Sequence, residues 1–431
     1  MAALPDTLAG WLARLEQQHP QAIDLGLERV REVAAKLSLG KPARHVISVA
    51  GTNGKGSTVA FIEAIARAAG LKVGSYTSPH LLRYNERVRI DGVDARDADL
   101  IAAFNAVEAA RGEVSLTYFE AGTLAALWLF ERADLDLAVL EVGLGGRLDA
   151  VNIVDADAAV ITTVDLDHQD WLGEDIEAIG FEKAGIARAW KPLILGDEDP
   201  PASVLRHAYA IGASSWRIAN DFFAEPVDAT HWRWREVGDE LLLPVPTLAA
   251  PVQLGNAACA IAALRSIGFE AEPDVFARGI DQAHVGARLQ RIEHDGIEVL
   301  IDVGHNPQAA RALAEALRAM AVEGRTRAVY AALADKDVAG VADALKGAVD
   351  DWYLAGSVLA GNRGLEADDL ADRLAADLPL RGRFKTVDDA IDAALREARA
   401  GDRLLVFGGF HAAEQGLKHF AEGGAGTDGA L

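Results

Sequence analysis

The chain has 431 residues, of which half are hydrophobic and a quarter are charged, a composition typical of a soluble globular protein with two or three domains. Its formal net charge of −23 argues against general binding to nucleic acid or to an anionic membrane surface. The single cysteine, Cys259, excludes an internal disulfide and is consistent with a cytoplasmic location. The apolar stretches are shorter than the ~18–20 residues that a membrane-spanning helix needs.

Strands and helices are predicted to alternate over most of the chain. Two amphipathic helices are expected within residues 7–37, with Asp24 available as the N-cap of the second. Short β-branched apolar runs predict buried strands at 45–50, 71–76, 137–142, 158–164, 297–302, 328–333, 351–354 and 403–407. Helical spacing predicts helices at 57–69, 120–131, 255–267, 307–321, 338–345, 387–399 and from 366. Residues 231–235 alternate like an exposed strand.

This alternation predicts an α/β protein with two domains. We place the first domain at residues 1–290, with a mostly parallel sheet. The second, at residues 291–431, is expected to be a smaller, doubly wound Rossmann-like domain.

A glycine-rich loop, Gly51–Ser57, lies between the first predicted strand and the helix that follows it. Backbone N–H groups in such a loop bind phosphate together with the N-terminus of the next helix. Lys55 would reach the β- and γ-phosphates of a nucleotide, and the Ser57 hydroxyl would bind Mg²⁺. The strict P-loop pattern fails, because Val49 replaces its first glycine and Gly56 separates lysine from serine. We still predict a P-loop ATPase domain here, the alternative being a simple glycine turn.

The loop resembles the ATP loop of the Mur ligase and folylpolyglutamate synthase superfamily. Further segments, in the family's order, resemble the bifunctional dihydrofolate synthase/folylpolyglutamate synthases of bacteria. They are Thr77–Leu81, Tyr84–Arg87, Thr117–Glu120, Glu141–Asp149, Asp167–His168, Glu182–Gly185 and Asp302–Pro307. Mur ligases carry a nucleotide-sugar domain before the loop, whereas here 50 residues precede Gly51, which favours the folate branch.

The resemblance implies a site for Mg²⁺, with two ions expected. The implied ligands are Ser57, Ser78, Glu141, His168 and Lys183. Three of them follow predicted strands, at the edge where doubly wound sheets bind ligands. Imidazole is an unusual Mg²⁺ ligand, so from spacing alone His168 could instead be a loop histidine bonded to Asp165 or Asp170.

The resemblance also implies that Lys183 is carbamylated on Nζ, which converts a cation into a carboxylate-like group near the metal ions. From the sequence alone, Lys183 could be a solvated helix residue. Potassium is a further candidate ion.

ATP and substrate contacts are expected from both domains. For ATP, the resemblance implies Gly54, Lys55, Gly56, Ser57, Asn256, Arg288 and Asp302. For the pterin substrate, the resemblance implies Tyr118, Phe119, Glu120, Ala121, Leu148, Asp149 and Ala150. We also expect Arg83, Arg87 and Thr117 at that substrate and His305 at the incoming glutamate. Structural alternatives remain at several positions: helix caps at Asn256 and Asn306, a solvated linker at Arg288, hairpin charges at Arg83, Arg87 and Arg89, and core packing at Tyr118 and Phe119.

The expected enzyme is an ATP-dependent amide ligase that acts through an acyl phosphate. It would join L-glutamate to 7,8-dihydropteroate and add further glutamates to reduced folates, with Lys55, Lys183 and His305 as catalytic residues. We expect a cytoplasmic monomer without nucleic acid or membrane partners. The alternatives are a monofunctional folylpolyglutamate synthase, a Mur-type ligase for another amino acid, and a non-catalytic, ATP-gated folate-binding protein.

Overall fold

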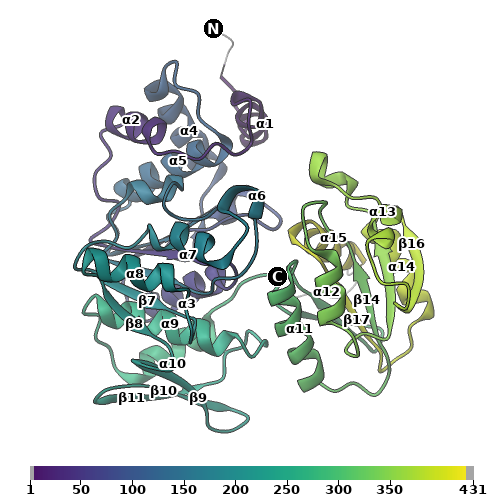
Figure 1. Cartoon of the computed structure of the whole chain (residues 1–431). Helices are drawn as coiled ribbons and strands as arrows, with labels where there is room; N and C mark the ends of the chain where they lie inside the picture. Colours follow the sequence, from purple (N-terminus) through teal and green to yellow (C-terminus); the bar gives the residue numbers. More distant parts are fainter. Residues whose placement is uncertain (1–3, 424–431) are drawn as a thin grey trace. The chain divides into compact units, whose positions relative to one another are not determined.

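The computed structural model describes residues 4–423, which form two compact units (Figure 1). The first unit runs to Thr247 and continues over Gln253–His284, and the second comprises Leu248–Val252 and the chain from Val285. The sequence analysis placed this division at residues 290 and 291. The short segment Leu248–Val252 joins the second unit because Ala250 packs against that unit's core.

An eight-stranded sheet forms the centre of the first unit, in the order β4-β3-β2-β5-β1-β6-β7-β8. Its strands are β1 (His45–Ala50), β2 (Val73–Tyr76), β3 (Val88–Ile90), β4 (Val93–Asp94), β5 (Leu137–Glu141), β6 (Ala158–Ile161), β7 (Pro192–Leu195) and β8 (Ser214–Arg217). The strands from β2 to β8 in this order are parallel, and β3 and β4 are antiparallel additions at one edge. Val49 of β1 pairs with Glu141 of β5, so these two strands end at the same level.

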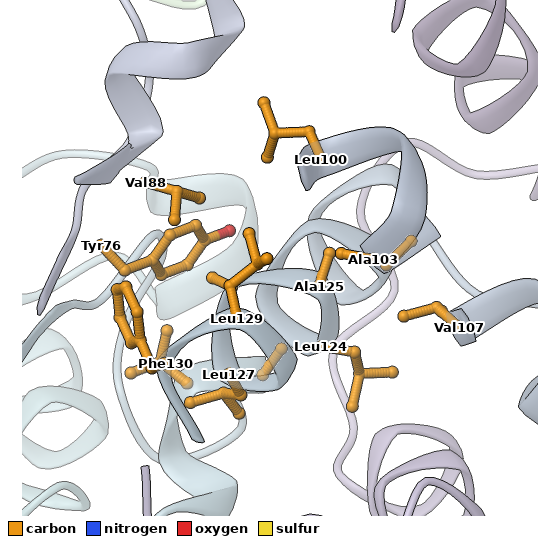
Figure 2. Packing of buried hydrophobic residues seen from close by; sticks show 14 of the residues in the cluster. Tyr76, Val88, Leu100, Ala103, Val107, Leu124, Ala125, Leu127, Leu129 and Phe130 are labelled. Carbon is orange, nitrogen blue, oxygen red and sulfur yellow. The ribbon is translucent and has the colours of Figure 1, made fainter. Parts of the chain in front are cut away.

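Helices from the start of the chain pack together at one end of the first unit, the top in Figure 1. They are α1 (Leu8–Gln18), α2 (Glu28–Lys36), α4 (Asp97–Arg111) and α5 (Tyr118–Arg132). Figure 2 shows part of their apolar cluster, in which Phe130 of α5 lies close to Tyr76 of β2. The short helices η1 (Tyr84–Arg87) and η2 (Ala150–Ile153) follow β2 and β5.

The remaining helices of the first unit follow the phosphate loop and the later strands. They are α3 (Lys55–Ala68), α6 (Gln169–Leu172), α7 (Ile176–Ala184), α8 (Ala202–Ile211), α9 (Gln253–Ser266) and α10 (Pro273–Gln282). α3 packs against α9 and α10. α7 and α8 form an apolar cluster with β6 and β7, to which Ile179 and Val204 contribute.

A three-stranded antiparallel sheet, in the order β11-β10-β9, lies at the lower end of the first unit in Figure 1. Its strands are β9 (Phe222–Pro226), β10 (His231–Glu236) and β11 (Asp239–Pro244). The prediction of an exposed strand at 231–235 was wrong in one respect. β10 is central, and Trp232 and Trp234 are fully buried because one face of the sheet packs on α9, where Trp234 Nε1 donates to the Ala258 carbonyl at 3.3 Å.

The second unit is built on a six-stranded sheet in the order β12-β13-β17-β14-β15-β16, parallel except for β12. The strands are β12 (Gln290–His294), β13 (Ile297–Ile301), β14 (Thr326–Tyr330), β15 (Asp351–Ala355), β16 (Leu380–Phe384) and β17 (Arg403–Phe407). Its helices are α11 (Pro307–Ala319), α12 (Val338–Ala344), η3 (Val358–Arg363), α13 (Ala367–Asp372), α14 (Val387–Glu397) and α15 (Phe410–Gly423). Two mostly parallel sheets with helices confirm the predicted α/β class. Within residues 4–423, no helix is long and apolar enough to cross a membrane.

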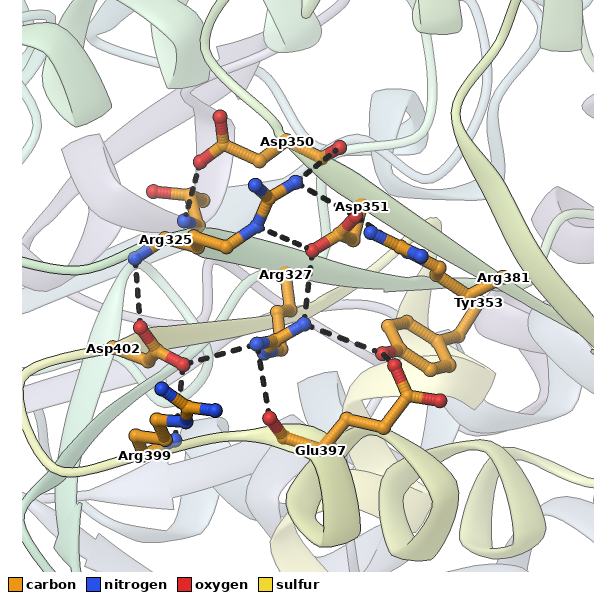
Figure 3. Close-up of polar contacts among 10 residues, drawn as sticks. Arg325, Arg327, Asp350, Asp351, Tyr353, Arg381, Glu397, Arg399 and Asp402 are labelled. Carbon is orange, nitrogen blue, oxygen red and sulfur yellow. Dashed lines mark hydrogen bonds and ion pairs between the residues drawn. The ribbon is translucent and has the colours of Figure 1, made fainter.

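A network of charged side chains supports the amino ends of the strands in the second unit (Figure 3). Asp351, fully buried at the start of β15, accepts hydrogen bonds from Arg325, Arg327 and Arg381 at 2.6–2.9 Å. Burial alone would raise the pKa of Asp351, but the hydrogen bonds from Arg325 and Arg381 outweigh it and hold that pKa below its ordinary value. Arg327 also donates to Asp402 at 3.1 Å, so the network joins β14, β15, β16 and the residue before β17.

Candidate active site

The glycines of the loop between β1 and α3 occupy positions that only glycine fits well. Gly51 and Gly54 have φ values of +148° and +86°, in the region that favours glycine. A Cβ at Gly51 would overlap Thr162 Oγ1, and a Cβ at Gly54 would lie 2.5 Å from Asn256 Oδ1. The loop backbone is therefore in direct contact with the segment after β6 and with α9.

Threonines after β6 hold the phosphate loop in place. Thr52 N donates to the Thr163 carbonyl at 2.7 Å, and Asn53 N donates to Thr163 Oγ1 at 3.0 Å. Thr162 Oγ1 donates to the Asn53 carbonyl at 2.5 Å. These bonds fix a loop that would otherwise be mobile, which keeps its geometry ready for a phosphate group.

Lys55 is the first residue of α3 and folds back over the loop. Its Nζ donates to the carbonyls of Gly51 at 3.0 Å and Thr52 at 3.2 Å. Ser57, two residues on, is buried in the first turn of the same helix. The cation and the hydroxyl predicted for the nucleotide site thus lie at the loop and at the positive end of the α3 dipole.

Asn256 lies close to the phosphate loop and is not a helix N-cap. α9 begins at Gln253, so Asn256 lies inside the helix and is buried. Its Nδ2 donates to Gln253 Oε1 at 2.9 Å, which directs Oδ1 to Gly54. The structure therefore brings α9 to the phosphate loop across about 200 residues of sequence.

Ser78 and Glu141 meet at the carboxyl ends of β2 and β5. Ser78 N donates to Glu141 Oε2 at 3.1 Å, and Glu141 is only 5% exposed. Because β5 pairs with β1, this carboxylate lies level with the start of the phosphate loop. A buried carboxylate beside a phosphate loop is a suitable place for a divalent cation.

His168 contacts Asp167, whereas the sequence analysis named Asp165 or Asp170 as its possible partners. It precedes α6 in the left-handed conformation, with φ +53°. Its backbone N donates to Asp167 Oδ1 at 2.9 Å, and its Nε2 lies 3.9 Å from Asp167 Oδ2. The carboxylate and the imidazole therefore face the same region.

Lys183 is buried in the last turn of α7, which excludes the alternative of a solvated helix residue. Burial and, to a smaller extent, the positive charge of Lys55 together lower the pKa of Lys183 to about 7, although the charge of Asp167 partly opposes the change. The amine consequently lies close enough to Lys55 and Asp167 to feel both charges, and a substantial fraction of it is neutral near pH 7.

Asp149 is a second buried ionisable group near Lys55. Its carboxylate accepts from Leu144 N at 2.9 Å and from Val151 N at 3.0 Å. Burial raises the pKa of Asp149 to about 7, although these hydrogen bonds and the Lys55 charge oppose the change. The charge of Lys55 thus acts on both Asp149 and Lys183, and the charge of Asp167 acts on Lys183 as well.

The expected magnesium ligands are chemically suited to a hard cation, since Ser57 and Ser78 offer hydroxyl groups and Glu141 offers a carboxylate. In the part of the chain that the structure describes, no group of three or more His, Cys, Asp and Glu residues is arranged to hold a metal ion. The expected set contains only two residues of those types, Glu141 and His168. A metal here would depend on hydroxyls, phosphate oxygens and a modified lysine as well.

The arginines predicted for substrate binding have different environments. Arg87 is buried, its Nε donates to His80 Nδ1 at 2.9 Å, and its guanidinium lies over the rings of Tyr84 at 5.3 Å and Tyr118 at 5.4 Å. Arg83 is mostly solvated, with its side chain 70% exposed. Arg87 therefore forms a group with Tyr118, while Arg83 has the environment expected of a hairpin charge.

Thr117 and Glu120 cap α5. Glu120 N donates to Thr117 Oγ1 at 3.2 Å, and Thr117 N donates to Glu120 Oε2 at 2.8 Å, a capping box. Arg29 donates to Glu120 Oε1 at 3.0 Å and pairs with Asp24 at 2.7 Å. Asp24 is therefore not the N-cap of α2, which begins at Glu28 without a side-chain cap.

Asp24 and Arg29 were not among the site residues that the sequence analysis predicted. The threonine and glutamate spacing that signals a capping box was visible in the sequence. The contact of Arg29 with a residue 91 positions away was not.

Phe119 and the loop after β5 are in contact. Phe119 lies beside Tyr76, with ring centroids 6.0 Å apart, and a Cβ at Gly143 would lie 2.6 Å from Phe119 Cζ. Tyr118 and Phe119 are both half-buried, so their rings are only partly committed to the core. Ala121 and Ala150 are buried, whereas Leu148 is half-buried.

In the second unit, the carboxylate of Asp302 accepts hydrogen bonds from Leu289 N at 2.9 Å and from Gly304 N at 2.7 Å. Burial raises the pKa of Asp302, although the positive charge of Arg288 opposes the change. Arg288 lies between two left-handed residues, Ala287 (φ +52°) and Leu289 (φ +48°), and over the Phe410 ring at 5.6 Å. Such backbone strain is typical of functional segments and argues against a plain solvated linker.

His305 and Asn306 follow the same strand as Asp302. His305 Nδ1 forms a hydrogen bond with the Val303 carbonyl at 3.0 Å, which leaves Nε2 as the acceptor of the neutral ring. Asn306 accepts from Ala309 N at 2.9 Å and is the N-cap of α11.

Comparisons with known proteins agree with this geometry. Residues 49–264 match the Mur ligase middle domain, and residues 287–410 match the glutamate ligase domain of Mur ligases. The chain is 48% identical to the dihydrofolate synthase/folylpolyglutamate synthase of Escherichia coli (strain K12), over 94% of this chain and 93% of the relative.

Solved structures are similar over nearly the whole chain. Escherichia coli FolC in complex with DHPP and ADP has a TM-score of 0.92 and 46% identity, covering 98% of this chain and 99% of that one. A bifunctional folylpolyglutamate synthase/dihydrofolate synthase with Mn, AMPPNP and L-glutamate bound has a TM-score of 0.89 and 43% identity, covering 97% of this chain and 100% of that one.

Proposed function

Because this chain belongs to the dihydrofolate synthase/folylpolyglutamate synthase family of Mur ligases, we propose how its own residues divide the work of that reaction. The enzyme is an ATP-dependent ligase that joins L-glutamate to 7,8-dihydropteroate and adds further L-glutamates to reduced folates. The observation that carries the assignment is the phosphate loop, with Lys55 at its end and the Ser78–Glu141 contact at the same edge of the sheet.

The chemistry requires an activated carboxylate, since oxide is a poor leaving group. Transfer of the γ-phosphoryl group of ATP to the carboxylate releases ADP and forms an acyl phosphate. The neutral glutamate amine then attacks the carbonyl carbon, the C–O bond to phosphate breaks, and the nitrogen loses a proton, so that the amide, inorganic phosphate and a proton are formed. Catalysis of the first step is mainly positioning and charge neutralisation, which we assign to Lys55 and the N–H groups of Gly54, Gly56 and Ser57.

We assign the binding of Mg²⁺ to Ser57, Ser78, Glu141, His168 and Lys183. When bound, Mg²⁺ would neutralise charge on the phosphate oxygens. The burial of Glu141 and its hydrogen bond from Ser78 support this assignment, because they hold a carboxylate at the edge of the phosphate loop. The solved relative that contains Mn is consistent with a divalent cation.

We further assign carbamylation to Lys183. Only a neutral amine adds to CO₂: the N–C bond forms, one proton leaves, and an anionic carbamate remains. The buried amine of Lys183, with its pKa lowered to about 7, meets that requirement at neutral pH. In a site that already contains Lys55, an anion at this position would also relieve the repulsion between two cations.

We assign the pterin substrate to the half-buried Tyr118, Phe119 and Leu148 together with the buried Arg87 and Asp149. Thr117 and Glu120 would support this group by capping α5, and Ala121 and Ala150 would support it by packing. Arg83 is the weakest member of the predicted set, because it is solvated.

We assign the binding of ATP to Asn256, Arg288 and Asp302. We assign to His305 the binding of the incoming glutamate and a role in catalysis. We also propose that the enzyme acts as a monomer in the cytoplasm, where ATP is supplied, and that potassium is a further ion to test. The single cysteine supports that location.

The test is phosphate release with ATP, Mg²⁺ and L-glutamate, with dihydropteroate or tetrahydrofolate supplied separately. Release with both substrates supports the two activities. Release with tetrahydrofolate alone would favour a monofunctional folylpolyglutamate synthase, and release with neither would contradict the proposal.

A further inference from the structure

The loop after β5 is bonded to the end of α7 through one ion pair. Arg147 donates from Nε at 3.1 Å and from Nη2 at 2.8 Å to Glu182 Oε1. Its backbone N also donates to the Glu182 carbonyl at 2.8 Å. Side chain and main chain of Arg147 thus both contact the residue that precedes Lys183.

The two backbones touch where this ion pair forms, because glycines face each other's segments. A Cβ at Gly146 would lie 2.8 Å from the Glu182 carbonyl oxygen and 3.1 Å from that of Lys183. A Cβ at Gly185 would overlap the Cβ of Arg147. With no side chain between them, the loop and the last turn of α7 are in direct contact, so a displacement of one is transmitted to the other.

Asn152 adds a second bridge between the same segments. Its buried Nδ2 donates to the Arg147 carbonyl at 3.0 Å and to the Gly185 carbonyl at 3.0 Å. These carbonyls come from the loop and from the end of α7, so one side chain joins them. The bonded segments also carry site residues: Asp149 follows Arg147, and Lys183 follows Glu182.

We propose that Arg147, acting through Glu182, is a positioning residue that fixes the last turn of α7 and thereby places Lys183 Nζ relative to the phosphate loop. This inference rests on the proposed role of Lys183. Partners that orient a ligand-bearing side chain typically change activity or metal affinity about 10–100-fold when they are removed. Arg147 and Glu182 were part of recognised motifs in the sequence, but neither was assigned a role.

The competing explanation is that the ion pair serves stability alone. The Arg147 side chain is 43% exposed, and exposed ion pairs contribute little to the free energy of unfolding. Its loss should therefore leave folding almost unchanged. A large effect on turnover with a small effect on unfolding would distinguish positioning from stability.

The chain offers a matched control in the three-stranded sheet. Arg235 donates from Nε at 3.0 Å and from Nη2 at 2.8 Å to Glu225 Oε1, and its guanidinium lies over Phe223 at 3.9 Å. Arg147 likewise lies over an aromatic ring, that of Phe181, at 5.7 Å. Both pairs have nearly the same geometry, but the Arg235 pair joins β9 and β10, which carry no assigned site residue.

The experiment compares full-length wild type, Arg147→Ala and Arg235→Ala in turnover with ATP, Mg²⁺, L-glutamate and tetrahydrofolate. We expect Arg147→Ala to lower kcat about 10–100-fold while the KM for ATP changes little, and Arg235→Ala to match wild type. A second readout is the carbon NMR signal of a lysine carbamate after incubation with labelled bicarbonate. That signal should weaken in Arg147→Ala and persist in Arg235→Ala.

Reversing both charges of the Arg147–Glu182 ion pair tests whether a loss of kcat comes from the broken ion pair or from misfolding. Arg147→Glu and Glu182→Arg should each lower kcat, and the double variant should recover about tenfold over either single change, because the ion pair is restored with reversed sign. Thermal unfolding of every variant is recorded alongside, since a positioning role predicts curves close to that of Arg235→Ala.

The outcomes separate this inference from the proposed function. A wild type with neither turnover nor a carbamate signal would contradict the role of Lys183 itself. An active wild type, with Arg147→Ala equal to Arg235→Ala in kcat and in the carbamate signal, would overturn the positioning role. If the double variant, Arg147→Glu with Glu182→Arg, recovered no kcat over the single variants, the positioning role of Arg147 would be overturned as well.

Discussion

Ser78 donates its backbone N–H to the carboxylate of Glu141 at 3.1 Å, joining the ends of β2 and β5 beside the phosphate loop. The residues are 63 positions apart, and only the parallel pairing of β2 with β5 brings them together. The contact holds the buried Glu141 carboxyl group at the edge of the sheet beside the loop that follows β1.

Replacement of Glu141 by Gln should raise the Mg²⁺ concentration needed for half-maximal turnover. The amide keeps the shape and an oxygen that accepts from Ser78, but it removes the negative charge. Turnover measured across a Mg²⁺ titration checks this, with thermal unfolding as the control for folding. If the variant and the wild type gave the same titration curve, Glu141 would not be a ligand.

Lys55→Ala should lower kcat by roughly 10²–10³-fold or more in both reactions, because a preorganised cation at the developing phosphate charge is lost. The amine donates to the loop carbonyls of Gly51 and Thr52, and thermal unfolding of the variant controls for a folding defect. Phosphate release with each pterin substrate measures the effect. A folded variant with near-normal release would exclude this loop as the ATP site.

Lys183→Ala should nearly abolish turnover, and a small carboxylic acid should restore part of it by supplying the missing anionic oxygens. Lys183→Arg should remain inactive, since a guanidinium stays charged and cannot form a carbamate. Kinetics of both variants, with and without added acid, provide the measurement. An active arginine variant would identify an unmodified cation at this position.

The raised pKa of Asp149 predicts that the free energy of unfolding falls as the pH rises. The folded pKa of Asp149, about 7, lies above the ordinary aspartate value of 3.8, so its contribution to stability is complete below pH 3.8 and is lost as the pH rises through about 7. Relative to Asp149→Asn, wild type should therefore lose up to roughly 4 kcal/mol of unfolding free energy over that range. Urea unfolding of both proteins from pH 4.5 to 8 tests this, and parallel curves would contradict the shift.

Phe119→Ala should damage dihydrofolate synthesis more than the addition of glutamate to folates. Phe119 contacts Tyr76 and approaches Gly143 at the start of the loop that carries Leu148 and Asp149. The ratio of the two activities is the measurement, with Lys55→Ala as the control that lowers both together. A proportional loss of both activities in Phe119→Ala would indicate a packing role.

Asp351→Ala should destabilise the second unit by about 3–5 kcal/mol, because it removes the acceptor of the buried Arg327 guanidinium and of the more exposed Arg325. Arg381→Ala is the control: its side chain is 46% exposed, so its loss should cost much less. Denaturant unfolding followed by tryptophan fluorescence reports on this core through Trp352. Equal effects of the two changes would argue against a central role of Asp351.

Much of the framework could be predicted from the sequence because its signals are local. The strands at 45–50 and 403–407 have the predicted bounds, since short β-branched and apolar runs are typical of strands buried in parallel sheets. The phosphate loop was recognisable for a similar reason: the conformation of Gly51 and Gly54 depends on their own lack of a Cβ. Resemblance to a known family supplied most of the remaining site residues.

Only the tertiary structure decided which side chains are buried and which meet. Periodicity made β10 look exposed, yet both of its tryptophans are buried, and Trp234 donates to a carbonyl of α9, which follows later in the chain. The burial of Arg87 and the exposure of Arg83 likewise depend on the helices packed around them. The lowered pKa of Lys183, about 7, depends on its burial at the end of α7 and on the charge of Lys55, 128 positions earlier. Solvent exclusion and Coulomb interactions act through space, so residue order along the chain does not reveal them.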